Sequence, residues 1–540
     1  MIRMCFRYLR KSGLLCLYIL SSLVTSLLSL SFPLIISTLI NGLVEGSLAA
    51  GEMVNWCLVF ACLGVIQSIA RYVSQAAYAS LQTKAGYSLN ADTIAHMQRI
   101  PKMAFEQLDA VYLNQQINHD ANGLMIFALT ASTKTIENVA IILIVLIVIS
   151  FISPLLACIC VAFALAGSLL YLGFRKGIFK RLLSMEESRA AFFSRLQEQL
   201  SKYDFIRTHA LYSTFKQRLN SSFELVFDAI MKSQRYGALY DSLSAGVSLL
   251  AQATLLFVSV LEIENGRIMV GYLPTIISFY SSFSSSVQFF STLGKEYQDS
   301  KVSYERVKRL WAIEEETYGD CELSSISDIQ VENLSFRYQA DGKDLFCGMT
   351  ANFKRGLLYG ISGPNGGGKS TLLKLIMGLY PKEYSGELRY SGKSQDELDL
   401  VALRASRIEV MEQEPQIIDG TVRDNLTIFA GGVEQSVLDR YIDLVGLSGF
   451  VNALPSRLDT ALDDLSSNLS GGEKQKIALI RLLLKNPDAM LFDEPTSALD
   501  SASREQFLDC VAQLKRSHII LVVTHDEAVL NACDRVITIG

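Results

Sequence analysis

The chain of 540 residues is long enough for two to four domains, at the usual size of about 100–200 residues each. Half of its residues are hydrophobic, 19% are charged, and the mean hydropathy is +0.28. This composition excludes a disordered chain, which has few apolar residues and much charge, and argues against an entirely soluble protein. The net charge of −5 is small for this length and does not indicate a nucleic-acid partner.

Charge is distributed unevenly along the chain. Residues 1–310 carry 27 Lys and Arg against 19 Asp and Glu, a net of +8, whereas residues 311–540 carry 22 against 35, a net of −13. The ten cysteines are scattered, mostly within apolar runs, without the spacing of a disulfide framework or a zinc site. We therefore expect two different kinds of domain, with a boundary near residue 311, in a reducing or membrane setting.

The basic part contains five uncharged stretches, each about long enough to cross a bilayer at roughly 20 residues per crossing. The stretch 138–174 is too long for one crossing and contains Ser153 and Pro154, so a turn there divides it into two helices. The sequence therefore predicts six spans. Their expected bounds are about 13–40, 53–75, 124–152, 155–175, 238–261 and 268–294.

The distribution of Lys and Arg predicts the orientation of these spans. Four cations precede the first span and twelve lie in residues 175–235, whereas the loop 41–52 and the turn 151–154 have none. We therefore expect both termini in the cytoplasm, in a multi-pass protein of a cell membrane, with the bacterial cytoplasmic membrane as first choice. The first apolar run is too long for a cleavable signal peptide.

The segments 71–133 and 175–241 are too long for turns and are not rich in Gly or Pro. Apolar residues such as Phe192, Leu196 and Leu200 recur at helical spacing. Long helices are therefore expected to continue from the membrane into the cytoplasm and to reverse there.

Two polar features of the spans allow alternative interpretations. Lys134 and Glu137 either lie at the inner membrane boundary, with the lysine reaching water, or form a buried ion pair. The run Ser278–Ser286 either lines a polar cavity or bonds carbonyl groups one turn back in its own helix.

The acidic part contains a phosphate-binding loop. Residues 363–371 read Gly-Pro-Asn-Gly-Gly-Gly-Lys-Ser-Thr, after an apolar strand pattern at 357–361 and before a helical pattern at 372–377. Backbone N–H groups and the helix N-terminus bind phosphate oxygens, while Lys369 reaches the β- and γ-phosphates and Ser370 binds Mg²⁺. The predicted nucleotide-binding residues of the loop are Gly363, Asn365, Gly366, Gly367, Gly368, Lys369, Ser370 and Thr371.

Two downstream strands end in candidate catalytic residues. The apolar run 489–492 leads into Asp493, which suits the Mg²⁺ shell, and Glu494, which suits positioning or deprotonating the attacking water. The run 519–523 leads to His525, which we expect at the same sheet edge, within reach of the γ-phosphate.

Between the loop and these strands lies Ser470-Gly471-Gly472-Glu473. Ser470 and Glu473 fit a helix N-terminal capping box. The two glycines at a helix N-terminus also make a second anion site. Two phosphate-binding surfaces for one nucleotide suggest a site shared between two copies.

Together these motifs resemble ATP-binding cassette (ABC) transporters of the exporter type, over almost the whole chain. Residues 469–473 match the ABC signature and 493–500 match the Walker B and D-loop run. Gln413 matches the Q-loop, Tyr338 the aromatic residue that stacks on adenine, and His525 the switch histidine. The resemblance thus implies catalytic roles for Glu494, His525, Gln413 and Lys369, with Ser370, Gln413 and Asp493 around the metal.

The resemblance implies a six-span helical membrane domain with long cytoplasmic extensions, followed by an α/β P-loop NTPase domain. The expected limits are 1–310, a linker at 311–325, and 326–540, with coupling segments near 109–114 and 204–212. It implies ATP and Mg²⁺ as cofactors and hydrolysis coupled to transport by alternating access. The partners are a second half-transporter (a homodimer or a heterodimer), the lipid bilayer, and an exported peptide, lipid or amphipathic small molecule. An importer on the same fold and a non-transporting membrane ATPase or regulatory subunit are the alternatives.

The chain departs from the family pattern at three places. Gly367 stands where Ser, Ala or Cys is usual, and Asp463 and Asp464 stand where exporters commonly have Gly and Glu. After Val536–Gly540 the family normally adds another strand and helix. Because the first span starts close to Met1, we expect no added peptidase domain before it.

Overall fold

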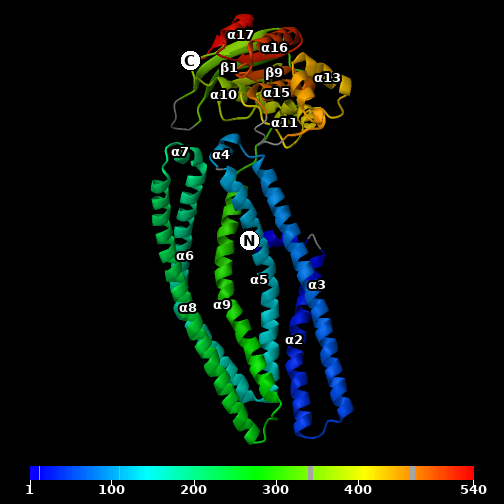
Figure 1. Cartoon of the computed structure of the whole chain (residues 1–540), viewed down its shortest axis with the longest axis vertical. Helices are drawn as coiled ribbons and strands as arrows, with labels where there is room; N and C mark the ends of the chain where they lie inside the picture. Colours follow the sequence, from blue (N-terminus) through cyan, green and yellow to red (C-terminus); the bar gives the residue numbers. More distant parts are fainter. Residues whose placement is uncertain (11–12, 109, 339–343, 463–468, 540) are drawn as a thin grey trace. The chain divides into compact units, whose positions relative to one another are not determined.

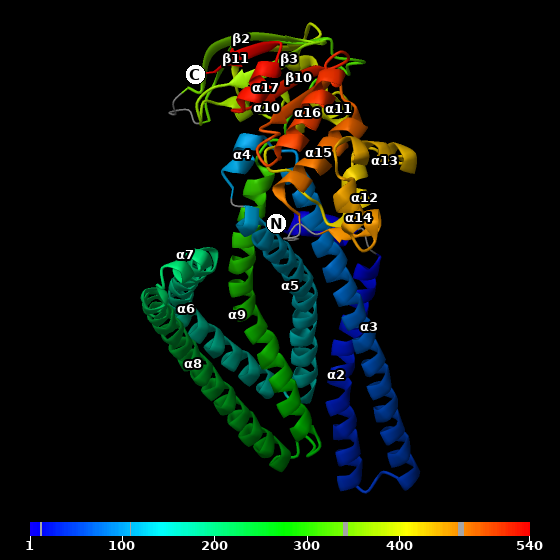
Figure 2. The same cartoon turned by 45° about the horizontal axis from the view of Figure 1, so that its top comes forward.

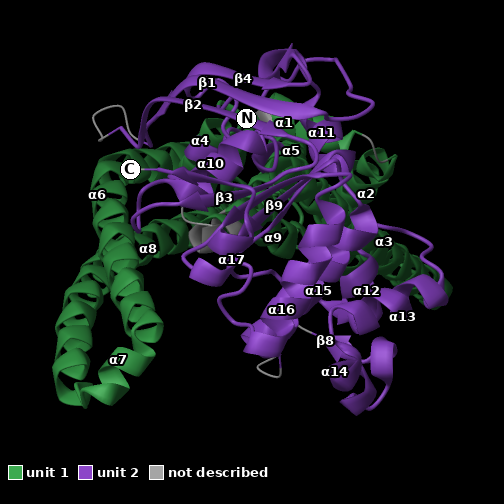
Figure 3. Ribbon diagram, turned by 90° about the horizontal axis from the view of Figure 1, so that it is seen from above, with its two compact units in different colours: residues 1–95, 110–312 green, residues 96–109, 313–540 purple. Residues whose placement is uncertain are grey.

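The computed structural model describes residues 1–10, 13–108, 110–338, 344–462 and 469–539 (Figure 1). Its contacts divide the chain into two compact units (Figure 3). The helical unit consists of Met1–Ala95 and Ala110–Ala312, and the α/β unit of His96–Asp109 and Ile313–Gly540. The second unit is thus assembled from two separated segments of the chain.

Six long helices follow the order of the predicted spans. They are α2 (Leu14–Val44), α3 (Ala50–Met97), α5 (Ala110–Ile152), α6 (Pro154–Ser201), α8 (Tyr212–Glu264) and α9 (Tyr272–Trp311). The short helices α1 (Ile2–Leu9) and α7 (Tyr203–Thr208) complete the helical unit. Within the described residues, five long helices are apolar enough to cross a membrane; α9 is not among them. Its first half contains the run Ser278–Ser286, whose hydroxyl groups lower its hydropathy.

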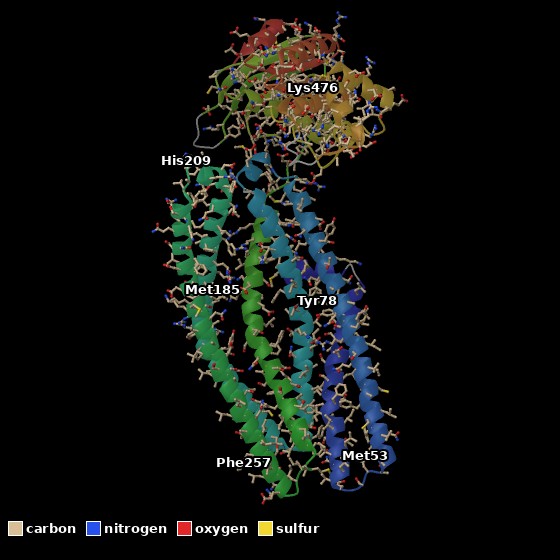
Figure 4. The ribbon with its side chains drawn as sticks, viewed as in Figure 1. Met53, Tyr78, Met185, His209, Phe257 and Lys476 are labelled. Atoms are coloured by element: carbon tan, nitrogen blue, oxygen red, sulfur yellow. The ribbon has the colours of Figure 1, made fainter. Side chains whose placement is uncertain are left out.

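The turn predicted at Pro154 is present. Ser153 is extended, with φ −158°, and Pro154 begins α6 at a first-turn position, where its missing N–H leaves no hydrogen bond unmade. The predicted extensions are also present: α6 and α8 lie side by side and reverse at α7 (Figure 2). Figure 4 places His209 and Phe257 toward opposite ends of this hairpin. At 1.5 Å per residue, the 53 residues of α8 span about 80 Å.

A polar cluster lies inside the helical unit. Glu137 is 2% exposed and pairs with Lys134 of the same helix at 2.7 Å, while Ser22 of α2 donates a hydrogen bond to the same carboxylate. The Lys134 side chain is 48% exposed. Each of the two interpretations therefore applies to one residue of the pair. Glu137 is buried and its charge is compensated inside the helical unit, whereas the Lys134 side chain extends outward.

The α/β unit contains three sheets. A four-stranded antiparallel sheet has the order β2-β1-β4-β5, a five-stranded parallel sheet the order β11-β3-β10-β9-β6, and β7 pairs with β8. The strands are β1 (Asp328–Phe336), β2 (Phe346–Lys354), β3 (Leu358–Ser362), β4 (Ser385–Tyr390), β5 (Lys393–Ser394), β6 (Ile408–Met411), β7 (Gly420–Thr421), β8 (Ala461–Leu462), β9 (Ala489–Asp493), β10 (Ile519–Val523) and β11 (Arg535–Thr538).

Eight α-helices accompany these strands in the described residues after Ile313. They are α10 (Lys369–Ile376), α11 (Leu400–Ser406), α12 (Val422–Thr427), α13 (Gln435–Leu444), α14 (Ser448–Ala453), α15 (Gly471–Lys485), α16 (Ser501–Leu514) and α17 (Glu527–Ala532). Residues 489–492 of β9 and all of β10 are apolar because both faces of a parallel sheet are buried. Alternate residues therefore pack into two different hydrophobic clusters, one on each face of the sheet. Leu491 belongs to the cluster that includes α10, and Met490 to the cluster that includes α15.

The segment His96–Asp109 packs within the α/β unit although it lies between α3 and α5 in sequence. Pro101 starts its short helix α4 (Lys102–Glu106), and Met103 packs against the core. This helix lies before the coupling segment expected near 109–114. Residue 109 of that segment lies outside the described residues, and residues 110–114 begin α5. The second expected coupling segment, 204–212, overlaps the short helix α7.

Candidate nucleotide-binding site

The predicted phosphate-binding loop connects β3 to α10. A Cβ at Gly363 (φ +156°) would lie 2.2 Å from the Ile539 carbonyl oxygen, and a Cβ at Gly368 (φ +93°) would lie 2.8 Å from side-chain atoms of Leu345 and Phe346. Only glycine fits these two positions. A cavity of about 690 Å³ opens at Pro364–Gly367, including the exposed Asn365. At Gly367 a Cβ would lie 3.0 Å from the Pro364 carbonyl oxygen, so glycine leaves the loop room that a larger residue would take.

Three predicted catalytic residues lie together beside this loop. The Lys369 Nζ donates to the carbonyl oxygens of Gly363 and Pro364, at 3.0 and 3.1 Å, and lies 2.9 Å from His525 Nε2. Because the ammonium group only donates, Nε2 is the acceptor and the imidazole proton is on Nδ1. The same Nε2 lies 3.8 Å from Glu494 Oε1. His525 therefore lies close to both Lys369, the predicted phosphate-binding residue, and Glu494, the candidate base.

The register of β9 and β10 explains this assembly. Asp493 pairs with Val523, so the residues that follow each strand emerge at the same carboxyl edge. Glu494 has φ +49°, which is uncommon for a residue with a side chain. Its N–H donates to the Val523 carbonyl at 2.9 Å, and its carbonyl accepts from Gln475 Nε2 at 3.4 Å. Neighbouring groups thus hold Glu494 in a backbone conformation of the kind found at active sites.

Asp493 and Ser370 have the character of magnesium ligands. The Asp493 carboxylate hydrogen-bonds with Ser370, yet its Oδ1 atom is buried and has no hydrogen-bond partner among the described residues. Burial raises the pKa of Asp493, which the Ser370 hydrogen bond and the nearby Lys374 and Lys369 partly oppose. A hydroxyl and a carboxylate beside a phosphate loop fit Mg²⁺, which commonly takes one or two carboxylates together with phosphate oxygens. Among the described residues, no group of three or more His, Cys, Asp or Glu gathers as a metal site.

Gln413 and Tyr338 lie at the ends of other strands. Met411 of β6 pairs with Phe492 of β9, so Gln413 follows β6 at the same edge as Asp493, with its side chain exposed. Tyr338 follows β1, and its hydroxyl lies 2.8 Å from Thr371 Oγ1. Tyr338 is 40% exposed as a residue, which is compatible with a base stacking on its ring.

The predicted capping box at Ser470 is present at the start of α15. Its hydroxyl accepts from the Glu473 N–H at 3.3 Å, and the Glu473 carboxylate accepts from the Ser470 N–H at 2.7 Å. Gly471 and Gly472 lie against Ala498: a Cβ at Gly471 would lie 3.0 Å from the Ala498 Cβ, and one at Gly472 would lie 3.0 Å from the Ala498 carbonyl oxygen. Between the described residues, no hydrogen bond or ion pair joins Ser470–Gly472 to residues 363–371. Asp463 and Asp464 lie outside the described residues.

One supporting residue escaped prediction from sequence. Gln475 is 2% exposed and donates to the Glu494 carbonyl and, at 3.0 Å, to Ser497 Oγ. Gln475 lies among the buried residues of α15, which also include Ile477 and Leu479. Because a buried polar side chain needs hydrogen-bond partners, a glutamine in this apolar pattern could have been recognised from the sequence as a supporting residue.

The apolar helices and the phosphate-binding site define a multi-pass membrane protein with a P-loop ATPase domain. The family model for the ABC transporter transmembrane region matches residues 15–287, and the model for ABC transporter matches residues 346–497. The chain belongs to the ABC transporter family, with both regions in one polypeptide. The family and the fold class expected from the sequence are thereby confirmed.

Known proteins are similar over different lengths. A Haemophilus influenzae protein described as a probable ABC transporter ATP-binding/permease protein is 29% identical over 60% of this chain and 57% of its own. An ATP-dependent lipid A-core flippase of Photobacterium profundum is 21% identical over 88% of this chain and 82% of its own. The structure of a bacterial Atm1-family ABC exporter with ATP bound superposes with a TM-score of 0.82 at 18% identity, covering 97% of this chain and 92% of that one.

Proposed function

We propose that this chain is a half-transporter that exports an amphipathic peptide, lipid or small molecule, driven by ATP hydrolysis. The observation that carries the proposal is the cluster of Lys369, His525 and Glu494 at one sheet edge, in a chain that also has the transmembrane region of the family. The similarity to a lipid A-core flippase over most of the chain supports transport of an amphipathic molecule outward.

Each residue of the site has a distinct task in hydrolysis. Lys369 and the N–H groups of the loop bind the nucleotide phosphates, and Tyr338 stacks on the base. Ser370, Asp493 and Gln413 would hold Mg²⁺, which supplies positive charge to the phosphate oxygens when bound. Glu494 accepts the proton of the attacking water, and His525 orients the γ-phosphate next to Lys369.

The exposed Ser470–Gly472 segment supports a dimer. The start of α15 offers free N–H groups, yet forms no hydrogen bond with the loop of its own chain in the described part. A second copy, turned head to tail, would bring its Ser470 to the nucleotide held by Lys369. Because the chain has its own Glu494 and His525, a homodimer would contain two complete sites. A heterodimer with a related chain would contain at least one.

The transport cycle follows from this arrangement. Closure of two ATP-binding domains around nucleotide would turn the membrane helices from an inward-facing to an outward-facing state, and hydrolysis at Glu494 would reset them. The excess of Lys and Arg before the first span and in 175–235 supports cytoplasmic termini, in the cytoplasmic membrane of a bacterium.

The proposal is tested with Glu494→Gln in the purified, reconstituted full chain. We expect ATP turnover to fall by at least about 100-fold, because the carboxylate base is lost, while ATP binding persists. Glu505→Gln, which changes an exposed glutamate of α16, is the matched control and should retain wild-type turnover. Wild-type turnover of Glu494→Gln would refute the base assignment.

Transport direction needs a separate measurement. In inside-out vesicles, ATP should drive accumulation of the transported molecule, and the Glu494→Gln variant should show none. ATP-driven loss from the same vesicles would indicate an importer instead. ATP hydrolysis with no flux of any peptide, lipid or amphiphile would indicate a non-transporting ATPase.

A further inference from the structure

A cavity of about 840 Å³ lies among α6, α8 and α9 of the helical unit. A smaller cavity of about 30 Å³ continues from it and shares Tyr240, Ser244 and Gln288 with it. Gln288 Nε2 donates to Ser244 Oγ at 3.2 Å, so α8 and α9 meet where the two cavities join. The larger volume lies within the usual range of about 300–1,000 Å³ for small-molecule sites.

The chemistry of the lining changes along the helices. Arg175 and Lys176 of α6 and Asp241 of α8 line the large cavity, whereas Phe163 and Phe283 line the small one. Arg175 and Phe163 are twelve residues apart in α6, which corresponds to about 18 Å along the axis. The cavities therefore have one charged end and one apolar, aromatic end, separated by the hydroxyl and amide groups of α8 and α9.

The charged groups at the wide end are available to a ligand. Arg175, Lys176 and Asp241 are exposed and form no ion pair with any described residue. Nearby charges are used within the protein: Arg181 lies 3.8 Å from the centre of the Tyr236 ring, and Lys232 pairs with Asp228 at 2.7 Å. Asp299, which also lines the cavity, is engaged in an interaction of its own.

Aromatic contacts join α6 and α8 close to these charged residues. The rings of Tyr171 on α6 and Tyr240 on α8 lie 6.2 Å apart, and Phe174 lies 5.9 Å from Tyr240. The two helices are thus joined by rings close to the charges: Tyr171 lies one turn before Arg175, and Tyr240 directly precedes Asp241. On the third wall, Gly294 of α9 faces Tyr171, and a Cβ there would lie 3.4 Å from the tyrosine oxygen. The glycine leaves space beside the charged end.

We propose that this cavity binds an amphiphile whose head group carries both an anion and an ammonium group. The anion lies against Arg175 and Lys176, the ammonium against Asp241, and the apolar part extends toward Phe283. This substrate class rests on the proposed export function. An aminophospholipid with one acyl chain and a short apolar peptide with free termini both have this chemistry. A head group with a single charge would pair with only one of the two signs of charge in this lining, whereas a head group with both charges pairs with Arg175, Lys176 and Asp241 together.

The test measures binding to the full chain in an uncharged sugar detergent, without ATP. The probes are four amphiphiles with the same alkyl chain, whose heads are phosphoethanolamine, phosphate, amine and glucose. We expect the phosphoethanolamine probe to bind at least about tenfold more tightly than each of the other three, because it alone satisfies both charges. An apolar tripeptide with free termini should bind, and its acetylated, amidated form should bind at least about tenfold more weakly.

Charge variants give the reciprocal test. Asp241→Asn should weaken the phosphoethanolamine and amine probes by about tenfold and should not weaken the phosphate probe. Arg175→Gln combined with Lys176→Gln should weaken the phosphoethanolamine and phosphate probes and spare the amine. Lys180→Gln on α6 and Glu224→Gln on α8 are matched controls at exposed positions outside the cavity and should change no affinity. Gly294→Leu should weaken all probes by occupying space beside Tyr171.

The outcomes distinguish the proposed substrate class from the proposed export function. If the wild-type chain binds all four heads equally, or prefers a head with a single charge, the substrate class is overturned even where a variant fails to fold. If only the lipid-like or only the peptide probe binds, the class stands and its source is identified. Because binding is measured without ATP, a chain that binds the phosphoethanolamine probe but transports nothing would refute export alone. A chain that exports only uncharged compounds would refute the substrate class alone.

Discussion

The hydroxyl group of Tyr380 donates a hydrogen bond of 3.1 Å to Glu106 and thereby joins α4 to the core of the α/β unit. The ring of Tyr380 also lies 5.8 Å from the Lys102 ammonium and 6.0 Å from the ring of Tyr338. Tyr380 therefore contacts both α4 and the residue expected to stack on adenine. A change of position at Tyr338, the predicted base-stacking residue, could reach α4 through the buried Tyr380 side chain.

This contact predicts an energetic coupling between Tyr380 and Glu106. Tyr380→Phe should lower the unfolding free energy of the protein by about 1.5–3 kcal/mol, because it removes one hydrogen bond to a carboxylate acceptor. The double variant with Glu106→Gln should lose less than the sum of the two single changes, as expected for residues in contact. Denaturant unfolding of the full chain measures the cycle. A control cycle with the exposed Glu397→Gln should be additive; additivity for Glu106 as well would contradict the contact.

A second prediction concerns Glu383. Burial, with the carboxylates of Glu316 and Glu106 nearby, raises the pKa of Glu383 to about 7, and its buried Oε2 atom has no hydrogen-bond partner in the part of the chain that the structure describes. The folded state thus holds the proton more tightly than the unfolded chain. The stabilising effect of protonation is complete below the unfolded pKa near 4.5 and is lost as the pH rises through 7.

Glu383→Gln should therefore raise the melting temperature at pH 8, where the wild-type carboxylate is charged, and the gain should shrink toward pH 5. Thermal unfolding of both proteins across this range measures the effect, with the exposed Glu505→Gln as the control. A difference that is constant with pH, or largest at pH 5, would show that Glu383 is not the titrating group.

His525 should be required for turnover more than for nucleotide binding. In His525→Ala the lysine keeps its two carbonyl partners in the loop but loses the imidazole next to Glu494. We expect kcat to fall by about 100-fold with little change in the KM for ATP. Steady-state ATPase kinetics measure both, and His119→Ala, a histidine side chain that is 82% exposed, is the control. An equal rise in KM at constant kcat would assign His525 to binding instead.

The buried carboxylate of Glu137 should be costly to remove alone. Glu137→Ala leaves Lys134 without its partner and the Ser22 hydroxyl without its acceptor, so we expect a loss of about 1–3 kcal/mol. Changing both Lys134 and Glu137 to Met should restore much of this stability, since no uncompensated charge remains. Unfolding in a series of detergent mixtures compares the variants, with Glu224→Ala on the exposed face of α8 as the control. A double variant less stable than Glu137→Ala would contradict this account.

Much of the site could be predicted because its residues follow strands directly. Asp493, Glu494 and His525 are adjacent in space since β9 and β10 are parallel neighbours, and two apolar runs that end in polar residues already indicate such an edge. The capping box at Ser470 and the break at Pro154 are local, so a few consecutive residues determine them.

Contacts between distant segments could not be predicted in the same way. The Ser22–Glu137 and Tyr380–Glu106 contacts join residues more than one hundred positions apart, and no local pattern identifies either partner. The position of α4 depends on where Met103 finds an apolar surface, which only the folded α/β unit supplies. The two alternatives for the run Ser278–Ser286 could not be separated from sequence either, because both occur. Ser282 donates to the Ser278 carbonyl one turn back, while Ser284 lines the smaller cavity.

The discontinuous make-up of the α/β unit has a consequence for biosynthesis. During translation α4 is complete about two hundred residues before Ile313, where the rest of its unit begins. Met103 and Glu106 therefore lack their packing partners until α5, α6, α8 and α9 have been synthesised and inserted. A fragment that starts at Ile313 would lack the cover for Tyr380 and part of its core surface. Correct folding of the catalytic unit is thus tied to the earlier, successful insertion of the membrane helices.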